Sequence, residues 1–193
     1  MALGAKALVT WDDAAAFIKP ADSDVPVVEA IVDGVSEYFN RRTRRTLRQM
    51  TYTALYLNGN GQTDFWLPNA PVIITVPLPL TLAVGSPTPL ALVINTDFYV
   101  DQDNGRLIRV SGEWDKGFRN ILTTHTAGWT EALMPRDLRL ACLEQSALQY
   151  QRWLSKSWAT QSTSMGGSSI SVSDEHLIKG LDKILDLYVR IPS

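Results

Sequence analysis

Eight consecutive positions, 41–48, carry the strongest charge feature of the chain. The five arginines in this segment, out of 18 lysines and arginines in all, are Arg41, Arg42, Arg44, Arg45 and Arg48. Guanidinium groups bind phosphate oxygens without reading base sequence, so the cluster fits non-specific, salt-sensitive contact with nucleic acid. It also follows a predicted helix, whose C-terminal dipole attracts cations, and arginines can form ion pairs between subunits. Both interpretations stay open.

Catalytic chemistry has few candidate residues. His125 lies in Thr-Thr-His-Thr, where strand alternation places it on the same face as Thr123, as expected of a structural histidine. Cys142 is the one cysteine; a catalytic thiol would need a histidine partner, so we interpret it as a small apolar residue on a helix. An enzyme with a site around His125 and Asp101 is therefore the weakest of three functional hypotheses.

A metal or cofactor site is not indicated. The run Asp-Gln-Asp-Asn-Gly at 101–105 matches the opening of a calcium loop, but the twelfth position, which needs a bidentate Glu, is Gly112. We interpret this run as a hairpin turn. There is no P-loop or dinucleotide fingerprint, and Gly59 and Gly61 precede a strand, whereas phosphate sites lie at a helix N-terminus. We therefore expect no catalytic residues, no metal and no cofactor.

The composition is that of an ordinary globular protein. The chain has 193 residues, 45% hydrophobic and 20% charged, and a net charge of −2, which gives no global attraction to nucleic acid or acidic membranes. No signal peptide is evident and no window nears the roughly 20 apolar residues that span a bilayer, so we expect a cytosolic setting at first and no membrane partner.

Two helices are predicted before residue 45. Thr10-Trp11-Asp12-Asp13 starts a short helix that ends near Ile18, before Pro20. Ser23 or Asp24 caps a longer helix with Pro26 in its first turn. Its predicted buried stripe is Val27, Val28, Ile31, Val32, Val35, Tyr38 and Phe39, and its predicted wet face is Glu29, Asp33 and Glu37.

From residue 50 to about 127 the hydrophobic period changes to two. Strands are predicted over 51–57, 65–67, 72–76, 90–94, 98–100, 106–110 and 121–126. The runs at 58–61 (Asn-Gly-Asn-Gly) and 103–105 (Asp-Asn-Gly) are typical of tight hairpin turns. Pro77, Pro79, Pro87 and Pro89 indicate a loop or edge segment that cannot form a central strand.

The helical period returns after Pro135. Its predicted seam is Leu140, Leu143, Ala147, Tyr150 and Leu154. Residues 155–169, rich in Ser, Thr, Gly and Gln, predict a flexible loop. A last helix is predicted from a cap at Ser173-Asp174 to Pro192, with an apolar stripe of Leu177, Leu181, Ile184, Leu185 and Tyr188.

Together these elements predict an α+β fold. Residues 1–49 and 130–193 would form a helical bundle from the N- and C-terminal helices, including the flexible loop 155–169. Residues 50–129 would form an inserted antiparallel β-rich region.

Several pieces, in order, resemble the head–tail connector (adaptor) family of tailed bacteriophages and phage-derived particles. They are the capped helix at 10–18, the helix through 28–39 with arginines at 41–44, the 55–72 hairpin pattern with Leu67-Pro68 and Pro71-Val72, Tyr99-Val100-Asp101 with Asn104-Gly105, Thr126-Ala127-Gly128-Trp129, and Met134-Pro135-Arg136-Asp137-Leu138. The resemblance covers roughly residues 8–155. Trp129 stands where the family commonly has tyrosine, and residues 77–89 and those beyond 155 match no family pattern.

This resemblance implies a non-enzymatic structural protein of the virion, located at the head–tail interface and assembled in the host cytoplasm. About twelve copies would form a ring beneath the portal protein and a platform for the stopper or tail-side connector protein. The C-terminal stripe Leu177, Leu181, Ile184, Leu185 and Tyr188 would dock into a partner, or else fold back on its own bundle. The arginine cluster would join neighbouring subunits or face packaged DNA.

The alternative from another class is a nucleic-acid-binding accessory protein that uses the five arginines of residues 41–48. Tight, salt-sensitive DNA binding by the isolated chain would favour it over the adaptor hypothesis.

Overall fold

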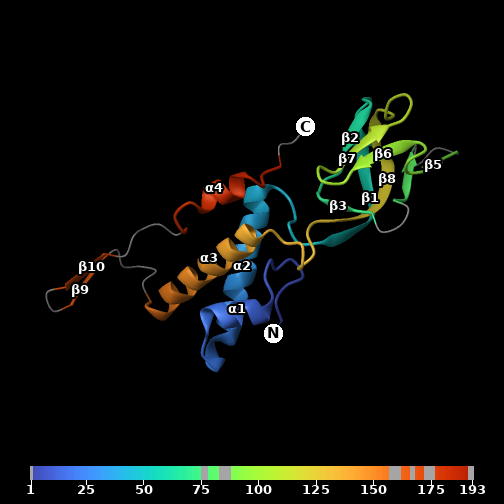
Figure 1. Cartoon of the computed structure of the whole chain (residues 1–193). Helices are drawn as coiled ribbons and strands as arrows, with labels where there is room; N and C mark the ends of the chain where they lie inside the picture. Colours follow the sequence, from blue (N-terminus) through green and yellow to red (C-terminus); the bar gives the residue numbers. More distant parts are fainter. Residues whose placement is uncertain are drawn as a thin grey trace. The chain divides into compact units, whose positions relative to one another are not determined.

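The computed structural model describes residues 2–74, 78–82, 88–156, 162–165, 168–171 and 177–190. The chain divides into two compact units: Met1–Arg44 with Glu131–Arg190, here the helical unit, and a second unit formed mainly by Arg45–Thr130, here the β unit. The N- and C-terminal helices pack together and antiparallel sheets are inserted between them in sequence (Figure 1). The predicted α+β fold class is confirmed.

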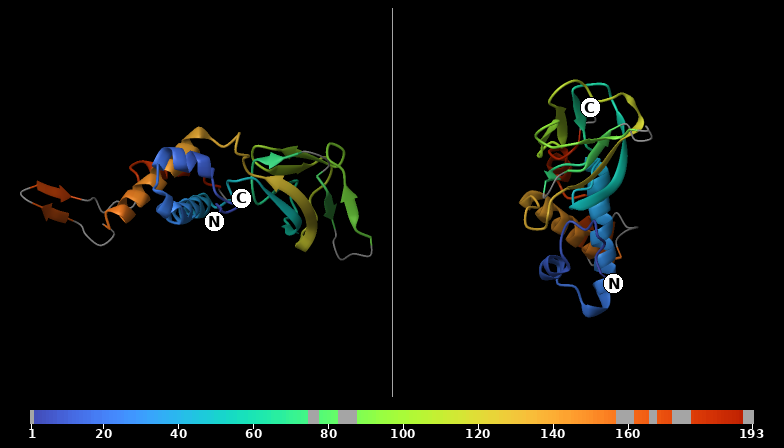
Figure 2. Two further views of the ribbon diagram at one scale, coloured as in Figure 1. Left: turned by 90° about the horizontal axis from the view of Figure 1, so that it is seen from below. Right: turned by 90° about the vertical axis from the view of Figure 1, so that its right-hand side faces the viewer.

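In its described residues, the helical unit contains four α-helices and one 3-10 turn. They are α1 (Trp11–Ile18), η1 (Asp22–Asp24), α2 (Val25–Thr43), α3 (Arg136–Leu154) and α4 (Leu181–Asp186). Thr10 begins α1 as predicted, because its hydroxyl accepts the backbone N–H of Asp13 at 3.2 Å. Helices α2 and α3 lie side by side (Figure 2). Asp24 occupies the first position before α2, but its carboxylate instead accepts the Tyr150 hydroxyl at 2.7 Å.

The predicted wet face of α2 is largely covered. Glu29 is only 5% exposed, and Asp33 accepts the backbone N–H of Gly4 at 2.9 Å. Ser36, also on α2, accepts the N–H of Leu8 at 3.1 Å. The N-terminal segment therefore packs along this side of the helix, and the prediction that Glu29 faces solvent is wrong.

The predicted seam of α3 is also partly wrong. Leu140 and Leu154 are 48% and 46% exposed, whereas the polar residues Gln145 and Ser146 are fully buried. Helix α3 is contacted by α1, α2 and α4, so its buried surface wraps around the helix and does not follow one leucine stripe. The side-chain oxygen of Gln145 accepts the backbone N–H of Ile178 at 2.9 Å, and this hydrogen bond offsets the cost of burying the amide.

The C-terminal helix is shorter than predicted. Only Leu181–Asp186 is α-helical, after Gly180 in the left-handed conformation with φ +88°. Leu177 therefore precedes the helix and Tyr188 follows it. The predicted cap at Ser173-Asp174 and the predicted end at Pro192 lie outside the described residues.

The described strands of the β unit form two sheets. Its larger sheet has the order β1 (Met50–Gly59), β8 (Gly117–Ala127), β4 (Leu80–Leu82), β5 (Leu90–Leu92), and β3 (Val72–Ile73) also pairs with β8. The smaller sheet has the order β2 (Asp64–Trp66), β7 (Arg106–Arg109), β6 (Phe98–Asp101). All the pairings among these named strands are antiparallel, and the long partners β1 and β8 lie side by side in both views of Figure 2.

The two predicted hairpin turns have different outcomes. The turn at 103–105 joins β6 to its partner β7, with Gly105 at φ +69°, so this hairpin is confirmed. The turn at 58–61 leads from β1 to β2, which lie in different sheets and do not pair, so a hairpin here is wrong. Its residues still make a tight turn, since the Asn60 side chain accepts the Gln62 N–H at 3.1 Å.

The proline-rich segment contains an internal strand, contrary to expectation. Strand β4 pairs with β8 on one edge and with β5 on the other. Residues Leu80–Leu82 contain no proline, so their backbone N–H groups are all available for pairing. Pro79 and Pro89 lie just outside the paired residues, and Pro77 and Pro87 lie outside the described part of the chain.

The core of the β unit surrounds Trp114, which is fully buried. Its ring lies 5.9 Å from that of Phe65 and 6.1 Å from that of Phe98, measured between centroids. The cluster also contains Leu80, Leu82 and Ile121 from the larger sheet and Leu107 from the smaller one. The two sheets of the β unit therefore share one core.

Residues 155–169, predicted to be a flexible loop, include regular structure. Strand β9 (Ser162–Met165) pairs in antiparallel fashion with β10 (Ser168–Ser171), and Met165 is opposite Ser168. Two glycines, Gly166 and Gly167, separate the strands in sequence, and glycine pairs are typical of two-residue hairpin loops.

Gly128 is required at the end of β8. Its φ is +100°, and a Cβ there would lie 2.6 Å from the carbonyl oxygen of Arg48. Its N–H donates to the carbonyl of Pro71 at 2.8 Å, and the next residue, Trp129, donates to Leu47 at 2.8 Å. We expect Gly128→Ala to lower the free energy of unfolding by at least about 2 kcal/mol, from strain plus a backbone clash.

Gly34→Ala is the matched control. Gly34 lies within α2, and a Cβ there would meet nothing within 4 Å. This substitution should leave stability unchanged or raise it by up to about 1 kcal/mol, since alanine is the better helix former. Urea unfolding followed by circular dichroism measures both variants. Equal stability of the two variants would contradict the role assigned to Gly128.

Candidate interaction surfaces

The C-terminal stripe folds back on its own unit. Leu181 and Leu185 are 1% and 0% exposed, and α4 contacts both α2 and α3. Leu177, Ile184 and Tyr188 are half-buried. The two fully buried leucines alone bring about 1.5–3 kcal/mol each of apolar burial to this contact.

Polar contacts fix the same segment along its length. Besides the bond from Ile178 to Gln145, the Tyr188 hydroxyl donates to the Asp137 carboxylate at 2.8 Å. The backbone N–H of Arg190 donates to the carbonyl of Thr43 at 3.0 Å. Contacts of this kind at both ends and in the middle give residues 177–190 a defined path over α2 and α3. On the outer side Leu187 is 77% exposed.

The five arginines do not form one surface. Arg42 pairs with Asp182 at 3.6 Å and with Asp186, and so joins α2 to α4. Arg41 pairs with Glu37 at 3.3 Å along α2, and its side chain is 78% exposed. Arg44 is the exposed residue that ends α2, in the left-handed conformation with φ +57°. These three belong to the helical unit.

Arg45 and Arg48 belong to the β unit. The Arg45 guanidinium lies 4.7 Å from the centroid of the Trp129 ring and donates to the carbonyl of Ala70 at 3.3 Å. A cation over an indole face is attracted by the ring quadrupole. Arg48 forms a parallel bridge with Trp129. Arg42 and Arg45 therefore have structural roles that sequence reasoning did not assign.

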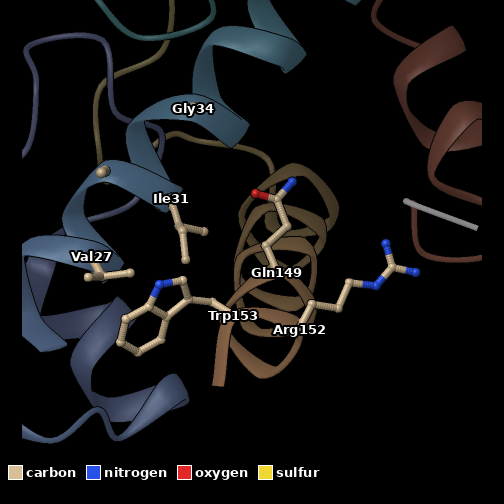
Figure 3. Close-up of a pocket in the computed structure, with 7 residues that line it drawn as sticks. Val27, Ile31, Gly34, Gln149, Arg152 and Trp153 are labelled. Atoms are coloured by element: carbon tan, nitrogen blue, oxygen red, sulfur yellow. The ribbon is translucent and has the colours of Figure 1, made fainter. Parts of the chain in front are cut away.

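A groove of about 400 Å³ lies between α2 and α3. Val27, Ala30, Ile31 and Gly34 line it from α2, and Gln149, Arg152 and Trp153 line it from α3. The Trp153 indole points toward Val27 and Ile31, while Arg152 points away from α2 (Figure 3). Sequence reasoning placed Val27 and Ile31 in a buried stripe and missed the groove. The sequence signal for the groove was Gly34, because a glycine in the middle of a helix leaves a gap where a side chain would otherwise lie.

His125 is a buried neutral residue. It is 3% exposed, on the same strand as the buried Thr123, and its ring stacks on Tyr52 with centroids 5.1 Å apart. Burial lowers the pKa of His125 to about 4. Among the described residues neither ring nitrogen has a hydrogen-bond partner. A general base needs a proton donor or acceptor within reach, so this arrangement offers packing and no evident catalysis.

Other titratable candidates are occupied structurally. The Asp101 carboxylate accepts from the side chain of Asn104 at 2.8 Å within the β6–β7 turn, and this bond holds the pKa of Asp101 below its usual value. Burial raises the pKa of the Cys142 thiol to about 11, so the thiol is protonated at neutral pH. The described residues contain no group of His, Cys, Asp and Glu that could hold a metal ion. No helix in the described part of the chain is long and apolar enough to cross a membrane.

Known proteins give one informative comparison. No family model matches the chain, and no curated protein matches it by sequence. Solved structures do match: a chain in the virion of a native gene transfer agent (GTA) particle has a TM-score of 0.56 at 15% identity. A chain in the neck of an empty GTA particle, computed with C6 symmetry, has 0.58 at 13%. One in the neck of a native GTA particle, computed with C12 symmetry, has 0.51 at 17%.

Each of these matches covers 100% of this chain and 94% of the other. The protein therefore has the fold of a chain found in the neck of a phage-like particle, over its whole length. This agrees with the class of protein that the ordered sequence motifs resemble.

The His125 environment predicts a pH dependence. The unfolded histidine has a pKa near 6.5 and the folded one about 4, so between these values only the unfolded chain binds the proton. The stability from this group is complete above pH 6.5 and falls as the pH drops from 6.5 to about 4, by at most about 3 kcal/mol; below that both states bind the proton and the loss levels off. Urea unfolding at pH 7.5, 6 and 4.5 measures the slope. His125→Phe keeps an aromatic ring on Tyr52 and should flatten it; an unchanged slope would assign the acid sensitivity to other groups.

We expect substitutions of the arginines to fall into two classes by their effect on stability. Arg42→Gln and Arg45→Gln remove an ion pair and a cation–π contact, so each should lower stability by up to about 1 kcal/mol. Arg41→Gln and Arg44→Gln should leave stability within about 0.5 kcal/mol, because both side chains are exposed. Thermal unfolding measures all four. Equal losses in both pairs would contradict the structural roles of Arg42 and Arg45.

Proposed function

We propose that the chain is a structural head–tail adaptor of a tailed phage or phage-like particle. It forms a ring of about twelve copies beneath the portal protein and a platform for the stopper or tail-side connector. The observation that carries this proposal is the whole-chain similarity of fold to neck chains of GTA particles. The ordered motifs, from the capped first helix to Thr126-Ala127-Gly128-Trp129, support the same assignment.

The site chemistry is consistent with a non-enzymatic role. His125 and Cys142 are buried, and Asp101 serves a turn. Binding between proteins needs surface shape and exposed apolar side chains, and the chain has several of these. In the β unit they are Tyr56, Leu90, Val93, Tyr99, Val110 and Phe118, the last 82% exposed.

We propose that residues 177–190 carry the portal contact while remaining folded on α2 and α3. Leu181 and Leu185 anchor the segment, and Ile184, Leu187 and Tyr188 are left at least partly accessible to a partner. Leu187 and Tyr188 follow directly after α4, and their N–H groups donate to the carbonyls of Ile184 and Leu185 at 3.2 and 2.9 Å, so the helical turn continues through them. The proposal assigns anchoring to Leu181 and Leu185 and docking to Ile184 and Tyr188 of the predicted stripe, together with Leu187, which lies outside it.

Two leucine substitutions separate these roles. Leu185→Ala removes a buried side chain and should lower the free energy of unfolding by about 2–5 kcal/mol. Leu187→Asp changes an exposed position and should leave stability within about 0.5 kcal/mol while weakening portal attachment. Co-sedimentation with portal particles measures attachment, and urea unfolding measures stability. Normal attachment of the Leu187 variant, and of a chain lacking residues 170–193, would place the portal contact elsewhere.

We propose that Arg41 and Arg44 contact a neighbouring subunit or the DNA that passes through the ring. They are the two exposed members of the cluster in the helical unit. If the double variant Arg41→Gln/Arg44→Gln assembled rings and retained DNA like the wild type, neither the subunit contact nor the DNA contact of these arginines would be supported. Tight, salt-sensitive DNA binding by the isolated wild-type chain would instead favour the nucleic-acid-binding alternative.

Electron microscopy of particles assembled with and without the protein tests the function as a whole. We expect a ring of density below the portal only when the chain is present, and heads without attached tails when it is absent. Particles with complete necks in its absence would overturn the adaptor role.

A further inference from the structure

Strands β9 and β10 form a two-stranded sheet on their own. Figure 1 draws them as two adjacent arrows, and neither pairs with any other described strand. An isolated two-stranded hairpin is marginally stable in water, because each strand has only one partner and one edge left open. A hairpin with two open edges is a template for further strand pairing.

The composition of this segment does not protect its edges. Residues 157–173 contain no charged residue and no proline, although both are common on the exposed edge strands of soluble proteins. The whole chain has 38 charged residues in 193 (18 basic and 20 acidic), so a neutral run of 17 is unusual. This composition favours a strand pair that is completed by another strand.

We propose that β9 of one copy pairs with β10 of the next copy in the ring, an inference that rests on the adaptor function proposed above. Within each hairpin β9 and β10 are antiparallel. When such hairpins repeat around an axis, β9 of one copy lies next to β10 of its neighbour, again in antiparallel orientation. Each contact uses two different edges, as in the head-to-tail interfaces that close rings, and a closed circle leaves no edge free.

The register indicates which backbone groups would make the contact. Two residues separate Met165 from Ser168, and in a two-residue hairpin the residues that flank the loop form a hydrogen-bonded pair. Hydrogen-bonded and non-hydrogen-bonded pairs then alternate, so Thr163 and Ile170 form the next bonded pair. The N–H groups of Ser164 and Ser169 consequently point to the open edges.

Proline substitutions test this assignment. Ser164→Pro and Ser169→Pro remove N–H groups from the two open edges and spare the bonds within the hairpin. The double variant should lose rings, measured by electron microscopy of chain mixed with portal particles, while its thermal unfolding stays as in the wild type. Leu140→Ala, on the exposed side of α3, is the control for an unrelated surface change.

Cross-linking identifies the neighbour directly. Ser164→Cys and Ser169→Cys are made as two separate proteins, so a disulfide between these positions can only join two copies. Cys142 is buried and does not compete. When the two proteins are mixed, assembled into rings and oxidised, we expect a covalent dimer, at least tenfold more than in a mixture of Ser164→Cys with Leu140→Cys, whose substituted residue lies on the exposed side of α3.

The two proposals fail in distinguishable ways. If the wild-type chain makes no ring with portal particles, the adaptor function is wrong and the pairing proposal falls with it. If the wild type makes rings and the double-proline variant makes them equally well, without the expected cross-link, only the hairpin pairing is overturned.

Discussion

Strand β8 is the element on which the β unit depends. Its eleven residues pair with β1 and β3 and with β4, so three segments distant in sequence are held by one strand. Both ends of β8 need glycine: a Cβ at Gly117 would lie 2.9 Å from the Asn120 side chain, and at Gly128 it would meet the backbone of Arg48. Trp129 then binds back to Leu47, with Arg45 over its ring. The Thr-Ala-Gly-Trp motif is thus an exit from the sheet, and its residue types follow from backbone geometry.

Local chemistry in the sequence predicted local structure well. The helical period at 27–39, the Thr10 cap and the turn at Gly105 were all readable, because each depends on residues a few positions apart. The turn residues at 58–61 did not reveal which strand pairs with β1. Asparagine and glycine determine that the chain turns there, but β1 finds its partner some 60 residues later in β8. Likewise the prolines of this segment lie outside β4, and pairing on both of its edges depends on Leu80–Leu82, which contain no proline.

Burial of polar groups explains the errors in the helical unit. A hydrophobic pattern assumes that leucine marks the inside, yet Gln145 is fully buried and Leu140 half exposed. The buried amide has a partner, the backbone N–H of Ile178, which reaches it only because residues 177–190 return over α3. The same limit applies to the predicted docking stripe Leu177, Leu181, Ile184, Leu185 and Tyr188, because its sequence pattern does not show which side chains are buried. The sequence pattern identified its leucines, but whether these leucines face inward depends on Arg42, Gln145 and Asp137, which lie 32 or more residues away in the chain.

Electrostatics separates the behaviour of the free chain from that of an assembly. The net charge is −2, and Arg41, Arg42 and Arg45 already have intramolecular partners, so a single copy has little to attract DNA. The exposed guanidinium groups of Arg41 and Arg44 act over a Debye length of about 8 Å at physiological salt. In the proposed ring these groups would repeat around one axis, so the positive charge near that axis would grow with the number of copies. Weak attraction of DNA by the monomer would then be compatible with stronger attraction by the assembled ring, because symmetry brings together exposed arginines that are few on any one subunit.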